Sequence, residues 1–186
     1  DIQRIATTYN FYQTVDTAAT ESQTSDYFVV LTFALVTKTI DGDLIKNTQQ
    51  YQRAMEAKKE IIRHVYLIDV FRRKLETTDH MELLRMQREK WRPVVQYVEN
   101  KTFGLTIIQA AKKAGLPIEP LQADVSKFLR SEQISVYYKN GQVWHPKEAE
   151  WLAEFEDEVS NFPVAPFDDQ FDAVSYAGIV AAGKKI

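Results

Sequence analysis

The sequence contains no cysteine, only three histidines and no long apolar run, and each absence excludes a class of protein or site. Without cysteine the chain can form no disulfide, no thiolate zinc site and no cysteine nucleophile. The histidines at positions 64, 80 and 145 lack the spacing of metal ligands. No apolar run approaches membrane-spanning length, and the N-terminus lacks a signal-peptide pattern. A P-loop (GxxxxGK followed by Ser or Thr) is also absent, so we expect no ATP hydrolysis.

The composition is that of a globular chain, with 186 residues, 45% hydrophobic and 12% aromatic side chains. This length predicts a single domain, residues 1–186, with a sizeable core. The formal net charge of -3 gives no overall basic surface, so composition alone argues mildly against nucleic-acid binding. The chain begins at Asp1 rather than methionine, from which we expect a fragment of a longer protein.

The first half of the chain predicts three strands, at residues 11–16, 27–36 and 64–71, rich in β-branched and aromatic side chains. No long apolar helix separates them, which favours antiparallel pairing. Residues 38–63 are polar, with a helix-compatible stretch at 47–62, and we interpret this region as an insertion or a long hairpin.

The second half alternates between helix and strand. A helix at 79–91, a strand at 94–99, a helix at 103–114 and a strand at 118–121 predict a parallel crossover unit. Three further helices are expected at 126–139, at 148–161 and from about residue 168. Asn140-Gly141 could instead form a hairpin turn, but we favour the end of a helix there.

Together these elements predict an α/β fold of the ribonuclease H-like type. It has a mixed five-stranded sheet, three antiparallel strands followed by a parallel crossover, with helices on both faces. In such a sheet the first and fourth strands are parallel neighbours. Asp16 ends the first strand and Glu99 ends the fourth, so carboxylates on the last helix can converge with them.

The last helix begins with an acidic cluster, in which Asp168, Asp169 and Asp172 lie within five residues. Asp169 and Asp172 are one helical turn apart on the same face. Crowded carboxylates repel one another unless a cation lies between them, and Mg²⁺ or Mn²⁺ is a common choice. The alternative is a heavily capped helix, with Asp168 serving as the cap.

Other candidate acids have structural alternatives. Asp69 lies on the third strand beside two arginines and competes for the role of metal ligand, or else forms a structural salt bridge. Asp16 could be a turn residue, and Glu99 could pair with Lys101 at the surface. The joint pattern of these acids, rather than any one of them, favours a metal site.

The motifs resemble those of the C-terminal nuclease domain of the large terminase subunit of tailed bacteriophages and prophages, over about residues 11–177. The similar segments are 14–19 with 25–27, 66–72, 98–104, the basic pair Lys127 and Arg130, and 162–163 with 167–173. Two features depart from the family pattern. The insertion between the second and third strands is longer than expected, and Phe167 stands where a histidine is common.

The resemblance implies an endonuclease that cuts concatemeric double-stranded DNA with two Mg²⁺ or Mn²⁺ ions. Asp16 would bridge both ions, with Glu99 and one of Asp169 or Asp172 completing the two sites. Asp169 is the first choice, and Asp172 would bind the same ion or orient its waters. Lys127, Arg130 and Lys101 are the candidate contacts to DNA.

The resemblance also implies an upstream ATPase domain, which this chain lacks. The implied partners are a portal protein and a small terminase subunit, and no membrane is expected. The implied place of action is the host cytoplasm. One alternative function is an assembly or DNA-gripping module whose nuclease is silent outside the motor. Another is a related resolvase or ribonuclease H.

Overall fold

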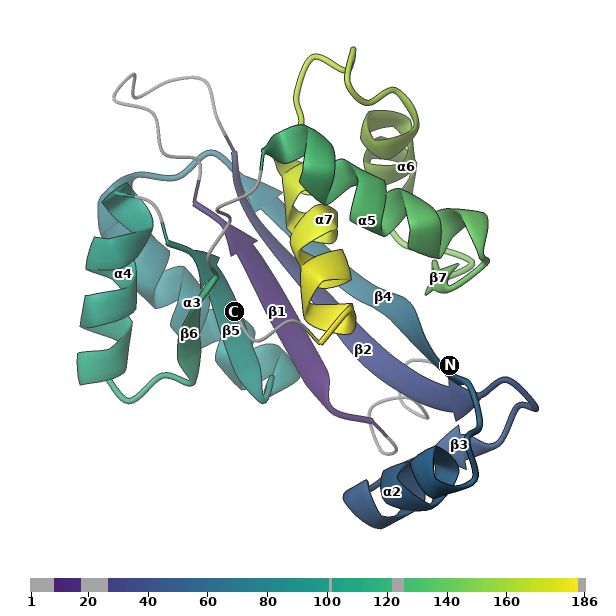
Figure 1. Ribbon diagram of the computed structural model, residues 1–186. Helices are drawn as coiled ribbons and strands as arrows, with labels where there is room; N and C mark the ends of the chain where they lie inside the picture. The colour runs from purple at the N-terminus through teal and green to yellow at the C-terminus, as the bar shows by residue number, and fades with distance from the viewer. Residues whose placement is uncertain (1–8, 18–26, 101, 122–125, 184–186) are drawn as a thin grey trace.

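The computed structural model describes residues 9–17, 27–100, 102–121 and 126–183. Its centre is a mixed sheet in the order β6-β5-β1-β2-β4-β7, and β3 pairs with β2 outside this path (Figure 1). The strands are β1 (Phe11–Asp16), β2 (Phe28–Thr39), β3 (Leu44–Ile45), β4 (Ile61–Arg73), β5 (Val95–Glu99), β6 (Ile118–Leu121) and β7 (Val143–Trp144). The five longer strands confirm the expected ribonuclease H-like sheet.

The pairing of the strands is also as expected. β1 is antiparallel to β2, and β2 is antiparallel to β4. β5 runs parallel to β1, and β6 runs parallel to β5. The expected pairing of the first and fourth strands as parallel neighbours is therefore confirmed. β3 was not predicted, because a two-residue strand has no periodicity to detect.

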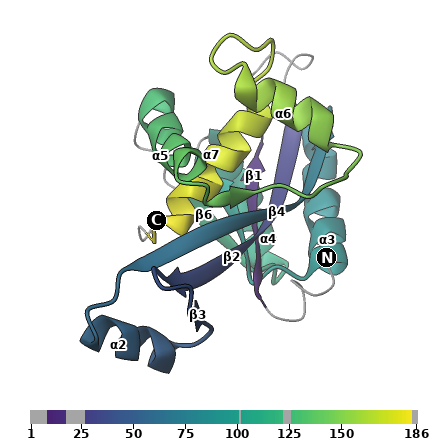
Figure 2. The ribbon, with the colours of Figure 1, turned by 90° about the vertical axis from the view of Figure 1, so that its right-hand side faces the viewer.

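Helices cover both faces of the sheet (Figures 1 and 2). α3 (His80–Trp91) and α4 (Thr102–Lys113) lie on one face, with a short 3-10 turn, Thr77–Asp79, before α3. The other face carries α5 (Lys127–Lys139), α6 (Leu152–Ser160) and α7 (Asp169–Ala181). α5 ends at Asn140, with Gly141 at a positive φ of 63°, so Asn140-Gly141 ends a helix and is not a hairpin turn. α6 begins at Leu152, four residues later than the acidic pattern suggested.

The insertion is shorter than the sequence indicated. β2 continues to Thr39 and β4 begins at Ile61, so the two strands form a long hairpin whose tip is residues 40–60. α2 (Thr48–Glu56) lies in this tip, and Ala54 is the buried residue of that helix. The hairpin tip projects from the end of the sheet away from the start of α7 (Figure 1).

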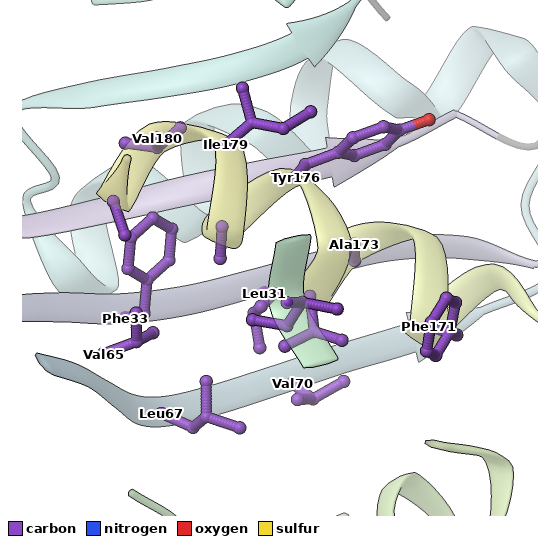
Figure 3. Packing of buried hydrophobic residues seen from close by; sticks show 14 of the residues in the cluster. Leu31, Phe33, Val65, Leu67, Val70, Phe171, Ala173, Tyr176, Ile179 and Val180 are labelled. Carbon is purple, nitrogen blue, oxygen red and sulfur yellow. The ribbon is translucent and has the colours of Figure 1, made fainter. Parts of the chain in front are cut away.

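The larger hydrophobic core lies between the sheet and α7. Its members come from β2, β4, β6, α5, α6 and α7, among them Leu31, Phe33, Leu67, Phe155 and Val174. Figure 3 shows how side chains of α7 pack against those of β2 and β4. All residues of α7 except Asp172 are buried, because α7 is packed against the sheet on one side and against α5 and α6 on the others. A second cluster joins β1, β2 and β5 to α3 and α4 on the opposite face. No described helix is long and apolar enough to cross a membrane.

Candidate active site

Asp16 and Glu99 lie side by side at the carboxyl ends of two parallel strands. Val15 of β1 is paired with Val98 of β5, so the next residues, Asp16 and Glu99, continue the two strands together. Successive side chains alternate between the faces of a sheet. Val15 and Val98 pack against α3 and α4, and the two acids therefore face the α7 side. Both are largely buried, with 9% of Asp16 and 5% of Glu99 exposed.

Gly104 brings the start of α4 close to Glu99. A Cβ atom at position 104 would lie 1.9 Å from the carbonyl oxygen of Glu99, closer than any side chain can approach. Only glycine allows this approach, which fixes the end of β5 against the following helix. This contact gives a physical reason for the glycine at the end of segment 98–104, which resembles the family's motif.

α7 is attached to β1 next to Asp16. The Thr14 hydroxyl donates a buried hydrogen bond of 2.8 Å to the carbonyl oxygen of Ala173, in the second turn of α7. Thr14 is on the same face of β1 as Asp16. The acidic first turn of α7, with Asp169 and Asp172, is thereby held over the ends of β1 and β5.

Asp172 is paired with Lys127 and Arg130, two of the three cations that the sequence analysis assigned to DNA. Lys127 Nζ lies 2.8 Å from Asp172 Oδ2, and Arg130 Nη2 lies 3.1 Å from Asp172 Oδ1. Lys127 also contacts Asp168. The Arg130 side chain is only 5% exposed, so it offers little surface to a DNA phosphate, whereas that of Lys127 is 31% exposed. Lys101 lies outside the described residues.

The charges around these two cations strengthen the pairing. Burial by itself would lower the pKa of Lys127, but the hydrogen bonds to Asp168 and Asp172 outweigh it and raise the pKa above its usual value. Burial likewise opposes the charge of Arg130, and the Tyr176 hydroxyl, Asp172 and Glu99 together raise its pKa. Both side chains therefore remain protonated beside the acidic turn.

Tyr176 is a site residue that the sequence analysis missed. It is fully buried, and its hydroxyl has no hydrogen-bond partner within the described part of the chain. Figure 3 shows the ring projecting from α7 with its hydroxyl directed away from the aliphatic side chains. Burial, and then the charges of Asp16, Asp172 and Glu99, raise its pKa, so the hydroxyl keeps its proton. Its position one turn after Asp172 was the available signal.

Asp69 and Asp168 each had two possible roles, and their contacts distinguish between them. Asp69 accepts hydrogen bonds from Lys90 Nζ at 2.8 Å and from Trp91 Nε1 at 2.9 Å. These partners are on α3, across the sheet from α7, so Asp69 has the structural salt-bridge role that was left open. Asp168 occupies the N-cap position of α7 but makes no side-chain capping bond. Capping therefore does not explain the acidic cluster.

The donors available near β1, β5 and α7 are carboxylate oxygens, the ligand type that suits Mg²⁺ and Mn²⁺. Within residues 9–17, 27–100, 102–121 and 126–183, no group of three or more His, Cys, Asp or Glu side chains is close enough together to hold a metal ion. Asp16 and Glu99 provide a buried pair, while Asp172 is drawn toward α5 by Lys127 and Arg130.

The sheet order and the acids at the ends of β1 and β5 define a ribonuclease H-like domain. Residues 13–179 match the family described as the terminase RNaseH-like domain, so the chain belongs to this family. No curated protein sequence matches the chain.

Two solved structures of the large terminase nuclease from thermophilic phage G20c are similar to this chain. The structure with bound zinc has a TM-score of 0.61 and 15% identity, covering 95% of this chain and 81% of that one. The structure with bound magnesium has a TM-score of 0.59 and 14% identity, covering 92% and 81%. At these identities the likeness shows the fold.

Proposed function

We propose that this chain is a metal-dependent endonuclease that cuts concatemeric double-stranded DNA for a phage packaging motor. The observation that carries the proposal is the buried pair Asp16 and Glu99, side by side at the ends of parallel strands beneath the acidic turn of α7. Two adjacent carboxylates supply the hard oxygen ligands that Mg²⁺ and Mn²⁺ prefer. Membership of the terminase RNaseH-like family supports the same chemistry.

Asp16 and Glu99 would hold Mg²⁺ or Mn²⁺, and Asp169 would complete the set by moving closer to them, since no three acids of the described residues lie within reach of one ion. Two bound ions would activate the attacking water and stabilise the leaving 3′-oxygen of the phosphodiester. Asp16, at the end of β1, would contribute to both sites. Because Lys127 and Arg130 hold Asp172, we assign it to orienting the first turn of α7 and any water near the ions.

The neutral Tyr176 hydroxyl is available as a hydrogen-bond donor to these carboxylates. Its charge neighbours are Asp16, Asp172 and Glu99, and it keeps its proton across the pH range in which nucleases work. A donor at this position would stabilise a carboxylate in the ionised form that a metal ligand requires.

Contacts to DNA would come from Lys127, which is partly exposed, and from Lys101. Contacts to phosphate carry no base information, so we expect little sequence preference. A chain with a net charge of -3 should bind DNA weakly and with strong dependence on salt. The portal protein, the small terminase subunit and an ATPase domain are the proposed partners, in the host cytoplasm.

The test is nicking of supercoiled plasmid by the purified chain with Mn²⁺, with Mg²⁺ and with EDTA. Asp16→Asn should abolish metal-dependent nicking, because it removes a charged ligand, and should leave the fold intact by circular dichroism. Asp69→Asn is the matched control, since it makes the same change in a strand aspartate across the sheet. Equal nicking by wild type and Asp16→Asn would refute the assignment.

A second candidate is a DNA-gripping and assembly module whose nuclease is silent outside the motor. The ion pairs of Asp172 with Lys127 and Arg130 favour it, because they occupy both carboxylate oxygens of one acid of the cluster with side-chain cations. A folded chain that binds Mn²⁺ but does not nick plasmid would support this second function.

A further inference from the structure

The N-terminus of α7 is capped by a residue from another helix. The first N–H groups of a helix have no partner within it. Glu158 of α6 supplies one, because its Oε1 accepts hydrogen bonds from the backbone N–H of Gln170 at 2.6 Å and of Phe171 at 3.0 Å. Its Oε2 accepts a third from Gln170 Nε2 at 2.8 Å. Glu158 thus fixes the turn that carries Asp169 and Asp172.

Glu158 is itself held by Arg72, at the end of β4. Only 6% of the Glu158 side chain and 8% of the Arg72 side chain are exposed, and Arg72 Nη2 lies 3.7 Å from Glu158 Oε2. Arg72 also contacts Glu154, one turn earlier on α6. A buried carboxylate is tolerated when it is paired and hydrogen-bonded in this way.

Two aromatic rings enclose the guanidinium of Arg72. It lies 3.6 Å from the centre of the Tyr27 ring and 5.1 Å from that of Phe167, and the two rings meet edge to face at 5.1 Å. Phe167 directly precedes the acidic cluster. The phenylalanine therefore shields the Arg72–Glu158 pair from water, which strengthens the pair's electrostatic attraction.

We propose that Glu158 is a positioning residue of the nuclease site, which orients the first turn of α7 so that its acids face Asp16 and Glu99. Arg72 holds Glu158 in place. The inference rests on the proposed function. A cap alone would add stability, whereas a positioning residue also sets how strongly the site binds metal and how fast it cuts.

The experiment compares wild type with Glu158→Ala, Glu158→Gln and the control Asp157→Asn. Asp157 is the adjacent, exposed acid on α6, so the control removes the same charge without touching α7. Three quantities are measured at a temperature where all four are folded: amide exchange at Gln170 and Phe171, Mn²⁺ affinity by calorimetry, and plasmid nicking against Mn²⁺ concentration.

We expect Glu158→Ala to lose amide protection at Gln170 and Phe171, to bind Mn²⁺ at least tenfold more weakly and to nick at least tenfold more slowly. Glu158→Gln should recover part of each, because its amide oxygen can still accept from the two N–H groups. Asp157→Asn should behave as wild type. Loss of amide protection in Glu158→Ala with wild-type Mn²⁺ affinity and nicking would reduce Glu158 to a cap and overturn the proposal.

Failure of the proposed function has a different signature. In that case wild type itself would neither bind Mn²⁺ nor nick plasmid, while the exchange of Gln170 and Phe171 would still respond to Glu158→Ala. That result would overturn the positioning role together with the nuclease. Wild type that binds Mn²⁺ without nicking leaves the affinity comparison to decide between a cap and a positioning residue.

Discussion

Tyr176 illustrates how a single atom group can be unfavourable for stability and useful for chemistry. Its buried hydroxyl has no hydrogen-bond partner in the described part of the chain, and three carboxylates surround it electrostatically. Leaving a buried donor unpaired costs about 1–3 kcal/mol. We expect the Tyr176 hydroxyl to donate a hydrogen bond to one of these carboxylates when the site binds metal and DNA.

Tyr176→Phe should therefore separate stability from activity. We expect the free energy of unfolding to stay equal or rise by about 1 kcal/mol, since the unpaired hydroxyl is removed. Nicking should slow about tenfold, because one hydrogen bond is lost in the transition state. Denaturant titration and plasmid nicking measure the two effects.

Tyr138→Phe is the opposite control. The Tyr138 hydroxyl is 3.0 Å from His145 Nε2, at the far end of α5 from Lys127, so its removal should lower stability and leave nicking unchanged. If both variants changed stability and nicking in the same way, Tyr176 would have no special place in the site.

At the scale of elements, the site depends on how closely helices approach strand ends. α4 starts almost in contact with the backbone of Glu99, because Gly104 has no side chain. α7 lies on β1 through the bond from Thr14 to Ala173, and the buried Glu158 of α6 accepts hydrogen bonds from its first turn. The contact at Gly104 positions Glu99, and the contacts of Thr14 and Glu158 position the acidic first turn of α7.

Gly104→Ala should disturb α4 and Glu99 together. The added methyl would overlap the Glu99 carbonyl oxygen, so we expect the free energy of unfolding to fall by about 1–3 kcal/mol and nicking to fall with it. Gly178→Ala is the comparison within a helix. Its Cβ would lie 3.3 Å from Ile134 side-chain atoms, and the gain in helix propensity of about 1 kcal/mol offsets that crowding. Equal thermal stability of the two variants would contradict this explanation.

The elements themselves were largely predictable, and their mutual contacts were not. The β-branched runs of β1, β2 and β4 and the crossover through α4 follow from local sequence and handedness, and together they place Asp16 next to Glu99. The sequence analysis named Asp172 as a candidate metal ligand, but it predicted neither the ion pairs of Asp172 nor the hydrogen bonds of Glu158 to α7. Their partners, Gln170 and Arg130, are set by the packing of α6 and α5 on α7, which periodicity does not encode.

For the whole molecule, the hairpin tip at 40–60 is separable from the fold. Ile40 N–H donates to the Glu60 carbonyl at 2.8 Å, so these residues face each other across the end of β2 and β4. The ion pairs of Lys59 with Asp41 and Asp43 are exposed and contribute little.

Replacing residues 41–59 by Asn-Gly, which suits a two-residue hairpin turn, should leave the fold and the nicking rate of the chain nearly unchanged. Thermal unfolding and plasmid nicking, compared with the full chain, check this. A chain that no longer folds without these residues would show that the tip belongs to the core.

The long hairpin also has a mechanical consequence. β2 and β4 have 12 and 13 residues and stay paired, with one shift of register at Thr32/Phe33, from the tip to the end of the sheet that lies beside the start of α7 (Figure 1). Such strands span about 40 Å. A force applied at the tip is carried along the strands and shared by the whole ladder of hydrogen bonds between them. A force on the hairpin tip at 40–60 should therefore leave the opposite end of the sheet, where we propose that DNA is cut, undistorted.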